Sequence, residues 1–304
     1  MTHLNLSINY RLLMTKFLIG ASAIMVIGLY TMVFFDQDKS GDNKSLFTAS
    51  YSRPAPQHAK DSLISIKSYT ELKDLFESSN YKLKPNDDGC VVVPRIYLSA
   101  LPKDFNRKTP ISSHKDTFLR SLLPLILDAN HEVMRERKVL VQLKEQDDRG
   151  EKLSLDDRLW LKELAAKYKV KHVDFDSLLK RVDIVPPSMA LAQAIEETGW
   201  GRSHAARLKN STFGVTLSQG VKKYDNLYES VRGYVLNLNS NAAYKSMRQI
   251  RHDLRNQSTD LCSIKLMQGL VSYSELRKAY INKITGIIRR YDLKRFDTAQ
   301  LQNL

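Results

Sequence analysis

The feature that most constrains this chain is an uncharged, apolar stretch from Phe17 to Phe35. Its nineteen residues match the roughly 20 residues that an α-helix needs to cross the hydrocarbon layer of a bilayer. A cleaved signal peptide is the alternative, but its apolar region is usually about 7–15 residues long and ends at an A-x-A-like site, which does not follow Phe35. A buried core helix is disfavoured because the stretch has no polar face. We therefore expect an uncleaved transmembrane anchor.

Charges on either side of this stretch predict its orientation. Arg11 and Lys16 precede it, and Asp36 and Asp38 follow it. Because basic residues are favoured on the cytoplasmic side, most of the chain is expected beyond the inner membrane, in the periplasm or cell wall. The segments predicted in this way are a cytoplasmic tail (1–16), a single-pass signal anchor (17–35) and a polar linker without periodicity (36–62).

The charge of the chain restricts its partner. The sequence has 47 Lys and Arg against 33 Asp and Glu, a net charge of +14. Nucleic acid, anionic lipid and anionic glycan can all bind such a surface. Only three of the basic and two of the acidic residues precede position 41, so the exported part keeps a net charge of +13. Because wall glycan, teichoic acid and lipid headgroups lie outside the membrane and nucleic acid rarely does, we expect one of these anionic partners and no nucleic acid.

Helical patterns dominate the exported part. With only 12 glycines and 9 prolines, a barrel or sandwich built from many tight turns is disfavoured. Apolar residues at three- and four-residue spacing predict a long helix over 116–145, which Pro124 should kink or restart. Polar caps and a β-branched run predict the remaining elements, which are helices from Ser68 to Phe76, from Ser154 to Tyr168 and from Asp174 onward, and a strand over Cys90–Val93. The fold class is therefore expected to be mainly α.

One helix end carries the chemistry. Pro186 and Pro187 can open a helix, and the following residues 189–195 are apolar on every side except at Gln193, which predicts a helix buried all round. Its last turn holds Glu196 and Glu197, and glycine follows where a helix C-cap is left-handed. The helix dipole and burial both raise the pKa of a carboxyl group there, as a general acid requires. The alternative is that both glutamates face solvent on a frayed end.

Two sequence blocks resemble a known signature. Residues 190–201, ALAQAIEETGWG, and 210–215, NSTFGV, resemble the signature of family 73 of the glycoside hydrolases, the N-acetylglucosaminidases that cut bacterial peptidoglycan. Similarity over Val93–Asp297 is to the bacterial Bax-like branch of this superfamily. The resemblance implies a lysozyme-like (α+β) catalytic domain with a small β-hairpin lobe over 183–297, after a helical N-terminal region over 63–182.

The resemblance also implies catalytic roles. Glycoside hydrolysis needs an acid and a group that stabilises or attacks the sugar carbon. Glu197 lies at the position of the family's catalytic glutamate, and we expect it to be the general acid. A second carboxylate is expected after Gly214, from Glu229 or Asp225, although Glu229 is equally explained as a helix N-terminal carboxylate. Substrate-assisted cleavage through the N-acetyl group would need no second carboxylate.

Other motif residues are expected to contact substrate. Tyr273 resembles the family's cleft tyrosine and is placed in the catalytic group, where it would orient the acetamido group or a water, unless it only packs in the core. Trp200 and Phe213 can offer rings to sugars or simply pack the motif helix. Asn210 is expected to hydrogen-bond the catalytic helix or the sugar. Gln193, the polar position of the buried helix, completes the predicted substrate-binding residues.

The prediction is a membrane-anchored endo-β-N-acetylglucosaminidase that cleaves β-1,4 bonds of peptidoglycan, acting as a monomer. An N-acetylmuramoyl-L-alanine amidase and a non-catalytic peptidoglycan-binding or scaffold protein are the alternatives. No cofactor and no metal are expected, because His131-Glu132 begins like a zinc-protease motif but Arg135 stands where the second histidine belongs. Cys90 and Cys262 can pair outside the cytoplasm or stay free.

Overall fold

The computed structural model describes residues 62–105, 110–217 and 220–303. Among these residues, 215–217 and 220–222 form a small unit of their own, and all the others form one larger unit. The predicted cytoplasmic tail and membrane anchor lie outside the described residues. Within the described ranges, no helix is long and apolar enough to span a bilayer. The expectation of a mainly helical chain is confirmed, and the described strands form only small two-stranded sheets.

Helices make up most of the larger unit, and its strands are short. The helices are α2 (Tyr69–Ser78), α3 (Ile111–Asp148), α4 (Leu155–Lys167), α5 (Phe175–Arg181), α6 (Pro187–Thr198), α7 (His204–Lys209), α8 (Leu227–Ser240), η3 (Ala242–Tyr244), α9 (Lys245–Asn256), α10 (Ser263–Met267), α11 (Lys278–Arg290) and η4 (Leu293–Phe296). Two parallel pairs join β1 (Leu63–Ile64) to β3 (Tyr97–Leu98) and β2 (Val92–Val93) to β6 (Gln300–Leu301). In the small unit, β4 (Thr216–Leu217) and β5 (Gly220–Val221) form an antiparallel hairpin.

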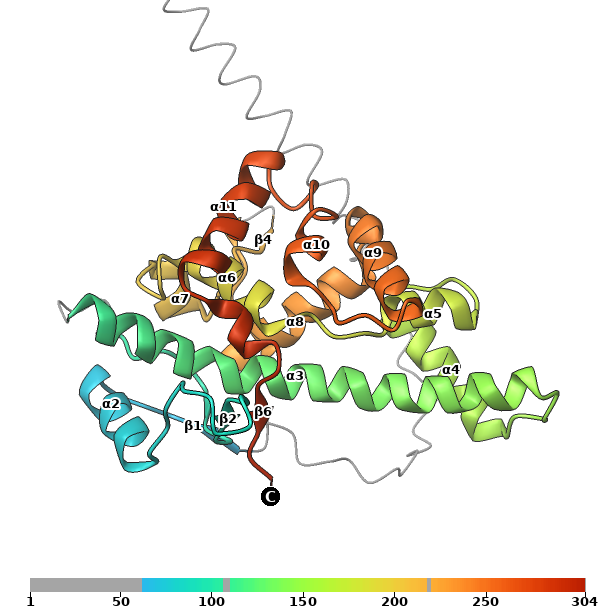
Figure 1. Cartoon of the computed structure of the whole chain (residues 1–304), viewed down its shortest axis with the longest axis horizontal. Helices are drawn as coiled ribbons and strands as arrows, with labels where there is room; N and C mark the ends of the chain where they lie inside the picture. Colours follow the sequence, from blue (N-terminus) through green and yellow to red (C-terminus); the bar gives the residue numbers. More distant parts are fainter. Residues whose placement is uncertain (1–61, 106–109, 218–219, 304) are drawn as a thin grey trace, which may run out of the picture. The chain divides into compact units, whose positions relative to one another are not determined.

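The long helix α3 organises the larger unit. It extends beyond the predicted range 116–145 at both ends, and Pro124 lies inside it. Of the two effects predicted for Pro124, the restart of the helix does not occur, and the kink stays a prediction. Nearly every residue from Phe118 to Asn130 is buried. Figure 1 shows the reason: α6, α8, α10 and α11 lie on one side of α3, and α2 with β1, β2 and β6 lies on the other. A helix enclosed in this way can be apolar on all its faces.

Local caps start the helices where the sequence predicts them. Ser68, Ser154 and Asp174 each accept a hydrogen bond from the backbone N–H three residues further on. Such a bond satisfies one of the free N–H groups of a first helical turn. The predicted starts of α2, α4 and α5 are therefore confirmed. The predicted division at residue 183 lies inside the larger unit, in the connection from α5 to α6.

The N-terminus of α6 is capped by the distant C-terminal segment. Pro186 offers no side-chain cap, but Asp297 accepts hydrogen bonds from both Ser188 N and Ser188 Oγ, each at 2.8 Å. A carboxylate is favourable at this position because it faces the positive end of the helix dipole. Since η4 packs along α6 and β6 pairs with β2, the end of the chain fixes where the predicted catalytic helix begins.

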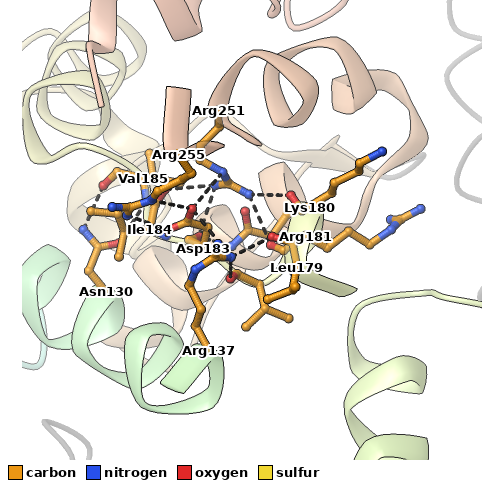
Figure 2. A network of polar contacts seen from close by, with 12 residues as sticks. Asn130, Arg137, Leu179, Lys180, Arg181, Asp183, Ile184, Val185, Arg251 and Arg255 are labelled. Carbon is orange, nitrogen blue, oxygen red and sulfur yellow. Dashed lines mark hydrogen bonds and ion pairs between the residues drawn. The ribbon is translucent and has the colours of Figure 1, made fainter. Parts of the chain in front are cut away.

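The connection from α5 to α6 is held by a buried carboxylate. Figure 2 shows Asp183 surrounded by arginines from α3 and α9. Arg255 donates from Nη2 to Asp183 Oδ1 at 2.9 Å and from Nε to Oδ2 at 3.0 Å. Arg137 Nη1 and Arg251 Nε lie 3.7 and 4.0 Å from Oδ2. Asp183 and Arg251 are each only 1% exposed.

Arg251 ties the same connection to backbone carbonyls. It donates to the carbonyl oxygens of Lys180, Arg181, Asp183 and Ile184 at 2.9–3.2 Å. Burial lowers the pKa of Arg251 to about 10. Burial alone would raise the pKa of Asp183, but the hydrogen bond from Arg255 and the nearby arginine charges lower it below its ordinary value. Asp183 therefore stays ionised and joins α3, α5 and α9 just before α6.

Candidate active site

The end of α6 has the conformation that the sequence predicts. Gly199 follows the helix with a left-handed φ of 56°, which glycine adopts without a Cβ penalty. Thr198 Oγ1 accepts a hydrogen bond from Gly201 N at 2.8 Å. A Cβ on Gly201 would lie 2.8–2.9 Å from side-chain atoms of Phe118 and Phe105. The turn after the helix is therefore packed directly onto the start of α3 and its preceding loop.

Glu197 lies half-buried in the last turn of α6. Burial raises the pKa of its carboxyl group above the ordinary value, and the charge of Glu196 adds to this rise. A hydrogen bond from Tyr280 and the charge of Lys283 act in the opposite direction. Lys283 Nζ lies 2.5 Å from Glu196 Oε1, so the two adjacent glutamates have different partners. A glutamate that holds its proton towards neutral pH can serve as a general acid.

Gly214, in the second block of the motif, lies directly against the Glu197 carboxylate. A Cβ built on Gly214 would overlap Glu197 Oε2 and lie 3.1 Å from its Cδ. The backbone of Gly214 also has a left-handed φ of 63°. Glycine is thus required here both for the backbone conformation and for the space that the carboxylate occupies.

Gly214→Ala is expected to displace the Glu197 carboxylate and to lower peptidoglycan hydrolysis by about 100-fold, because small misplacements of a catalytic group are costly. Gly199→Ala is the matched control, since Gly199 has a similar φ of 56° but a Cβ there would meet nothing within 4 Å. Both variants should lose about 1–2 kcal/mol of stability from the left-handed backbone. Equal loss of hydrolysis in the two variants would assign the effect to backbone strain instead.

A buried chain of hydrogen bonds ends on Glu197. Tyr280 Oη donates to Glu197 Oε1 at 3.2 Å and accepts from Gln193 Nε2 at 3.1 Å. Tyr234 Oη donates to Gln193 Oε1 at 2.6 Å. Gln193 is fully buried, and both ends of its amide have a partner. In this structure the side-chain amide of Gln193, which was predicted to bind substrate, is linked to the Glu197 carboxyl group through Tyr280.

Phe213 and Tyr273 pack against the two tyrosines of this hydrogen-bond chain. The Phe213 ring stacks on Tyr234 with centroids 3.8 Å apart, and its carbonyl accepts a hydrogen bond from Tyr273 Oη at 3.3 Å. Tyr273 stacks on Tyr280 with centroids 5.3 Å apart. Two predicted site residues therefore lie around the tyrosines that reach Glu197, and Tyr273 is half-buried.

Trp200 packs on the side of α3. Its ring lies edge to face with Tyr291 at 4.7 Å and with Phe118 at 6.0 Å between centroids. Lys115 Nζ lies 5.1 Å from its ring centre, and its carbonyl is hydrogen-bonded to His114 Nε2 at 2.8 Å. These contacts agree with the packing alternative for Trp200, while sugar binding by its half-buried ring stays a prediction.

Asn210 is hydrogen-bonded to the loop that precedes α8. It ends α7 with a left-handed φ of 51°, and its Nδ2 donates to the carbonyls of Tyr224 and Asp225 at 3.2 Å. The Asp225 side chain is exposed. In this structure the Asn210 amide therefore holds a loop, and its predicted contact with the sugar stays a prediction.

Glu229 lies in the first turn of α8. Its backbone N–H donates to Asn226 Oδ1 at 2.8 Å, and its Oε1 lies 3.7 Å from Arg232 Nη1. Arg232 is itself held by two hydrogen bonds to Glu132, at 2.7 and 2.8 Å. These contacts are those of a helix N-terminal carboxylate. The second catalytic carboxylate, from Glu229 or Asp225, stays a prediction.

Comparison with known proteins agrees with the motif. A glucosaminidase family model, described as mannosyl-glycoprotein endo-beta-N-acetylglucosaminidase, matches residues 173–293. Protein bax of Escherichia coli (strain K12) is 34% identical over 201 residues, which cover 60% of this chain and 72% of that protein. This chain belongs to the Bax-like glucosaminidases. The catalytic domain of the autolysin Auto from Listeria monocytogenes is a weaker structural match, with 16% identity, a TM-score of 0.30, and coverage of 50% of this chain and 96% of that domain.

In this Bax-like glucosaminidase, the motif alone does not identify all the neighbours of Glu197. Tyr234 and Tyr280 lie on helices at buried positions, where a tyrosine cannot be told from core packing by its spacing. One feature of the sequence does indicate that Glu197 has polar neighbours. A buried glutamine amide needs hydrogen-bond partners, so Gln193 on an otherwise apolar helix implied that polar groups of other segments lie nearby.

The other side chains that could bind a metal or form a disulfide are the histidines, cysteines and acidic residues. Within residues 62–105, 110–217 and 220–303, no three His, Cys, Asp or Glu side chains come together as a metal site would require. Cys90 and Cys262 are both free, and the Cys90 thiol lies 3.2 Å from the carbonyl oxygen of Thr298. The two cysteines are therefore unpaired in this structure.

Proposed function

We propose that this chain is an endo-β-N-acetylglucosaminidase that hydrolyses β-1,4 bonds of peptidoglycan, with Glu197 as its general acid. The observation that carries the proposal is the Glu197 carboxyl group, whose pKa is raised by burial and which lies against Gly214 at the end of α6. Membership of the glucosaminidase family supports the class of reaction. It gives no support to the amidase alternative.

The proposed reaction begins with proton transfer from Glu197. Its O–H gives a proton to the glycosidic oxygen while the bond between that oxygen and the sugar carbon breaks. Water then supplies the hydroxyl group on the sugar carbon, and the proton that this water loses restores the acid form of Glu197. Between these two steps, the Glu197 carboxylate can accept the hydrogen bond from Tyr280. The positive charge on the sugar carbon is stabilised by a second carboxylate, for which Glu229 is our candidate, or by the N-acetyl group of the substrate.

We further propose that residues 17–35 anchor the enzyme in the inner membrane, with the catalytic part on the periplasmic side. The anchor length and the flanking charges support this location. Membrane fractionation tests it: the full-length chain should stay with the membrane in high salt. Release by salt would contradict a spanning helix.

The proposed reaction is tested by analysing its products. The full-length chain, purified in detergent, should release fragments from peptidoglycan that carry new reducing ends on N-acetylglucosamine, as identified by mass spectrometry. New reducing ends on N-acetylmuramic acid would mean that the other glycosidic bond is cut. New free amines would indicate an amidase, and binding without any product would indicate a non-catalytic protein.

The pH dependence should respond to Glu196 and Lys283 in opposite directions. A general acid must be protonated, so kcat/KM falls as the pH rises through the pKa of Glu197. Glu196→Gln removes a charge that raises this pKa, so the alkaline limb should move to lower pH. Lys283→Met removes a charge that lowers it, so the limb should move to higher pH. Both shifts should be below about half a pH unit and shrink in high salt, because these groups are partly solvated.

The two variants control for each other. Each breaks the same Lys283–Glu196 ion pair, so any effect of losing the pair itself is common to both. Shifts in the same direction would show that the pair, rather than the individual charges, affects Glu197.

A further inference from the structure

The hydrogen bonds between Tyr234, Gln193, Tyr280 and Glu197 have a defined direction. The nitrogen of a glutamine amide only donates and its oxygen only accepts. Tyr280 Oη accepts from Gln193 Nε2, so its single proton is left for Glu197 Oε1. Tyr234 occupies the amide oxygen of Gln193 as a donor, at 2.6 Å. The Tyr280 hydroxyl group is thereby made a donor towards Glu197.

The opposite direction would suit a different protonation state of Glu197. With the Gln193 amide turned over, its oxygen would take the proton of Tyr280, and the Tyr280 oxygen would offer only lone pairs to Glu197. Such an arrangement can accept a hydrogen bond from a protonated carboxyl group, but it repels a carboxylate. The arrangement in this structure therefore matches the ionised form, which is the form left after proton delivery.

We propose that Gln193 and Tyr234 are positioning residues, which keep the Tyr280 hydroxyl group directed at Glu197 so that its carboxylate is stabilised where it forms. This inference rests on the proposed function, in which Glu197 gives its proton to the glycosidic oxygen. The three side chains come from α8, α6 and α11 and are at most 3% exposed. In such a dry environment a hydrogen bond to a charged group is strong.

Several charged and titratable groups face Glu197. They come from each element that packs around the carboxyl group: Glu196 of α6, Lys283 and Tyr280 of α11, Tyr234 of α8, and Tyr273 of the loop before α11. Because the variants below leave Glu196 and Lys283 in place, a change in the protonation of Glu197 reports on the hydrogen-bond chain.

Three variants of the full-length chain test the proposal: Tyr280→Phe, Gln193→Met and Tyr234→Phe. A hydrogen bond to the ionised form favours that form, so its loss raises the pKa of Glu197. The alkaline limb of kcat/KM should move to higher pH, by about one unit in Tyr280→Phe and by less in Gln193→Met and Tyr234→Phe. In the same order, kcat should fall, about tenfold in Tyr280→Phe.

A second measurement does not depend on activity. Carbodiimide reacts with protonated carboxyl groups, and mass spectrometry of peptides gives the pH at which labelling of Glu197 is half-complete. That midpoint should rise in all three variants. Tyr168→Phe is the matched control, because it also removes a buried tyrosine hydroxyl group that donates to a carboxylate, Glu136 at 2.6 Å. Tyr168 is not part of the hydrogen bonds that link Tyr234 to Glu197. This variant should leave the midpoint unchanged.

The outcomes separate this proposal from the proposed function. An unchanged labelling midpoint in Gln193→Met and Tyr234→Phe, with melting like that of the wild type, would overturn the positioning role. If Gln193→Met does not fold, the two Phe variants decide, since each keeps its ring and loses only a hydroxyl group. A wild-type protein that releases no sugar products would refute the proposed function. The labelling midpoints would still measure how Tyr234, Gln193 and Tyr280 affect the protonation of Glu197.

Discussion

Glu197→Gln should reduce the release of reducing ends from peptidoglycan by about 10²–10⁴-fold, the usual contribution of a general acid. The amide has nearly the same shape as the carboxyl group but has no proton to give. The stability of the folded protein should not decrease. Because burial raises the pKa of Glu197 in the folded chain, ionisation destabilises the fold as the pH rises from the unfolded to the folded pKa, and glutamine removes this cost. The melting temperature near neutral pH should therefore be unchanged or higher.

Glu196→Gln is the matched control for this experiment. Glu196 is the preceding residue of the same helical turn, but it is paired with Lys283 and should be dispensable for proton transfer. It should keep most of the hydrolytic rate. Wild-type activity in Glu197→Gln would remove Glu197 from the mechanism. Loss of activity in both variants, with intact folding, would mean that the turn rather than one carboxyl group is required.

Asp183→Asn should be the most destabilising of the charge-removing variants. It keeps the shape of the side chain but leaves Arg251, which is 1% exposed, without a countercharge. Breaking a buried ion pair in this way costs about 3–5 kcal/mol, which corresponds to a fall in melting temperature on the order of 10 °C for a unit of this size. Thermal unfolding followed by circular dichroism measures the loss.

The pH dependence gives this prediction a second readout. The pKa of Asp183 is lowered in the folded chain, so its stabilisation is present above the unfolded pKa and is lost as the pH falls through the folded value. The difference between wild type and Asp183→Asn should therefore narrow below about pH 4.

Asp148→Asn is the control for the loss of charge. Its partner Lys144 lies at 2.8 Å, but the Asp148 side chain is 59% exposed, and such solvent-screened surface pairs contribute little to stability. A loss in Asp183→Asn no larger than in this control would mean that the arginines are satisfied by the backbone carbonyls alone.

Helix starts and the catalytic turn could be predicted from the sequence because they depend on a few neighbouring residues. The caps at Ser68, Ser154 and Asp174 act on N–H groups three residues away, and Gly199 follows the last turn of α6. The limits of α3 were less predictable. Its extension beyond 116–145 and its passage through Pro124 depend on the elements that enclose it, which outweigh the hydrogen bond lost at proline.

The roles of single side chains were harder to predict than the helix ends, because they depend on partners from distant segments of the sequence. Gln193 was predicted to bind substrate, which stays a prediction, and in the fold both ends of its amide are hydrogen-bonded to tyrosines. Asn210 was expected near the catalytic helix or the sugar, and it holds a loop. In both cases the residue type was informative, because a buried or turn-forming amide needs partners, but the identity of the partner was not local information.

By itself, the sequence determined the helical class, the end of α6 and the glutamate in its last turn, because periodicity, caps and a two-block motif are properties of short segments. Only the tertiary structure decided what surrounds that glutamate. Tyr280, 83 residues further along the chain, donates to Glu197, and Asp297, 109 residues beyond Ser188, caps the same helix. Contacts between such distant segments depend on how the helices pack, and no local pattern encodes that packing.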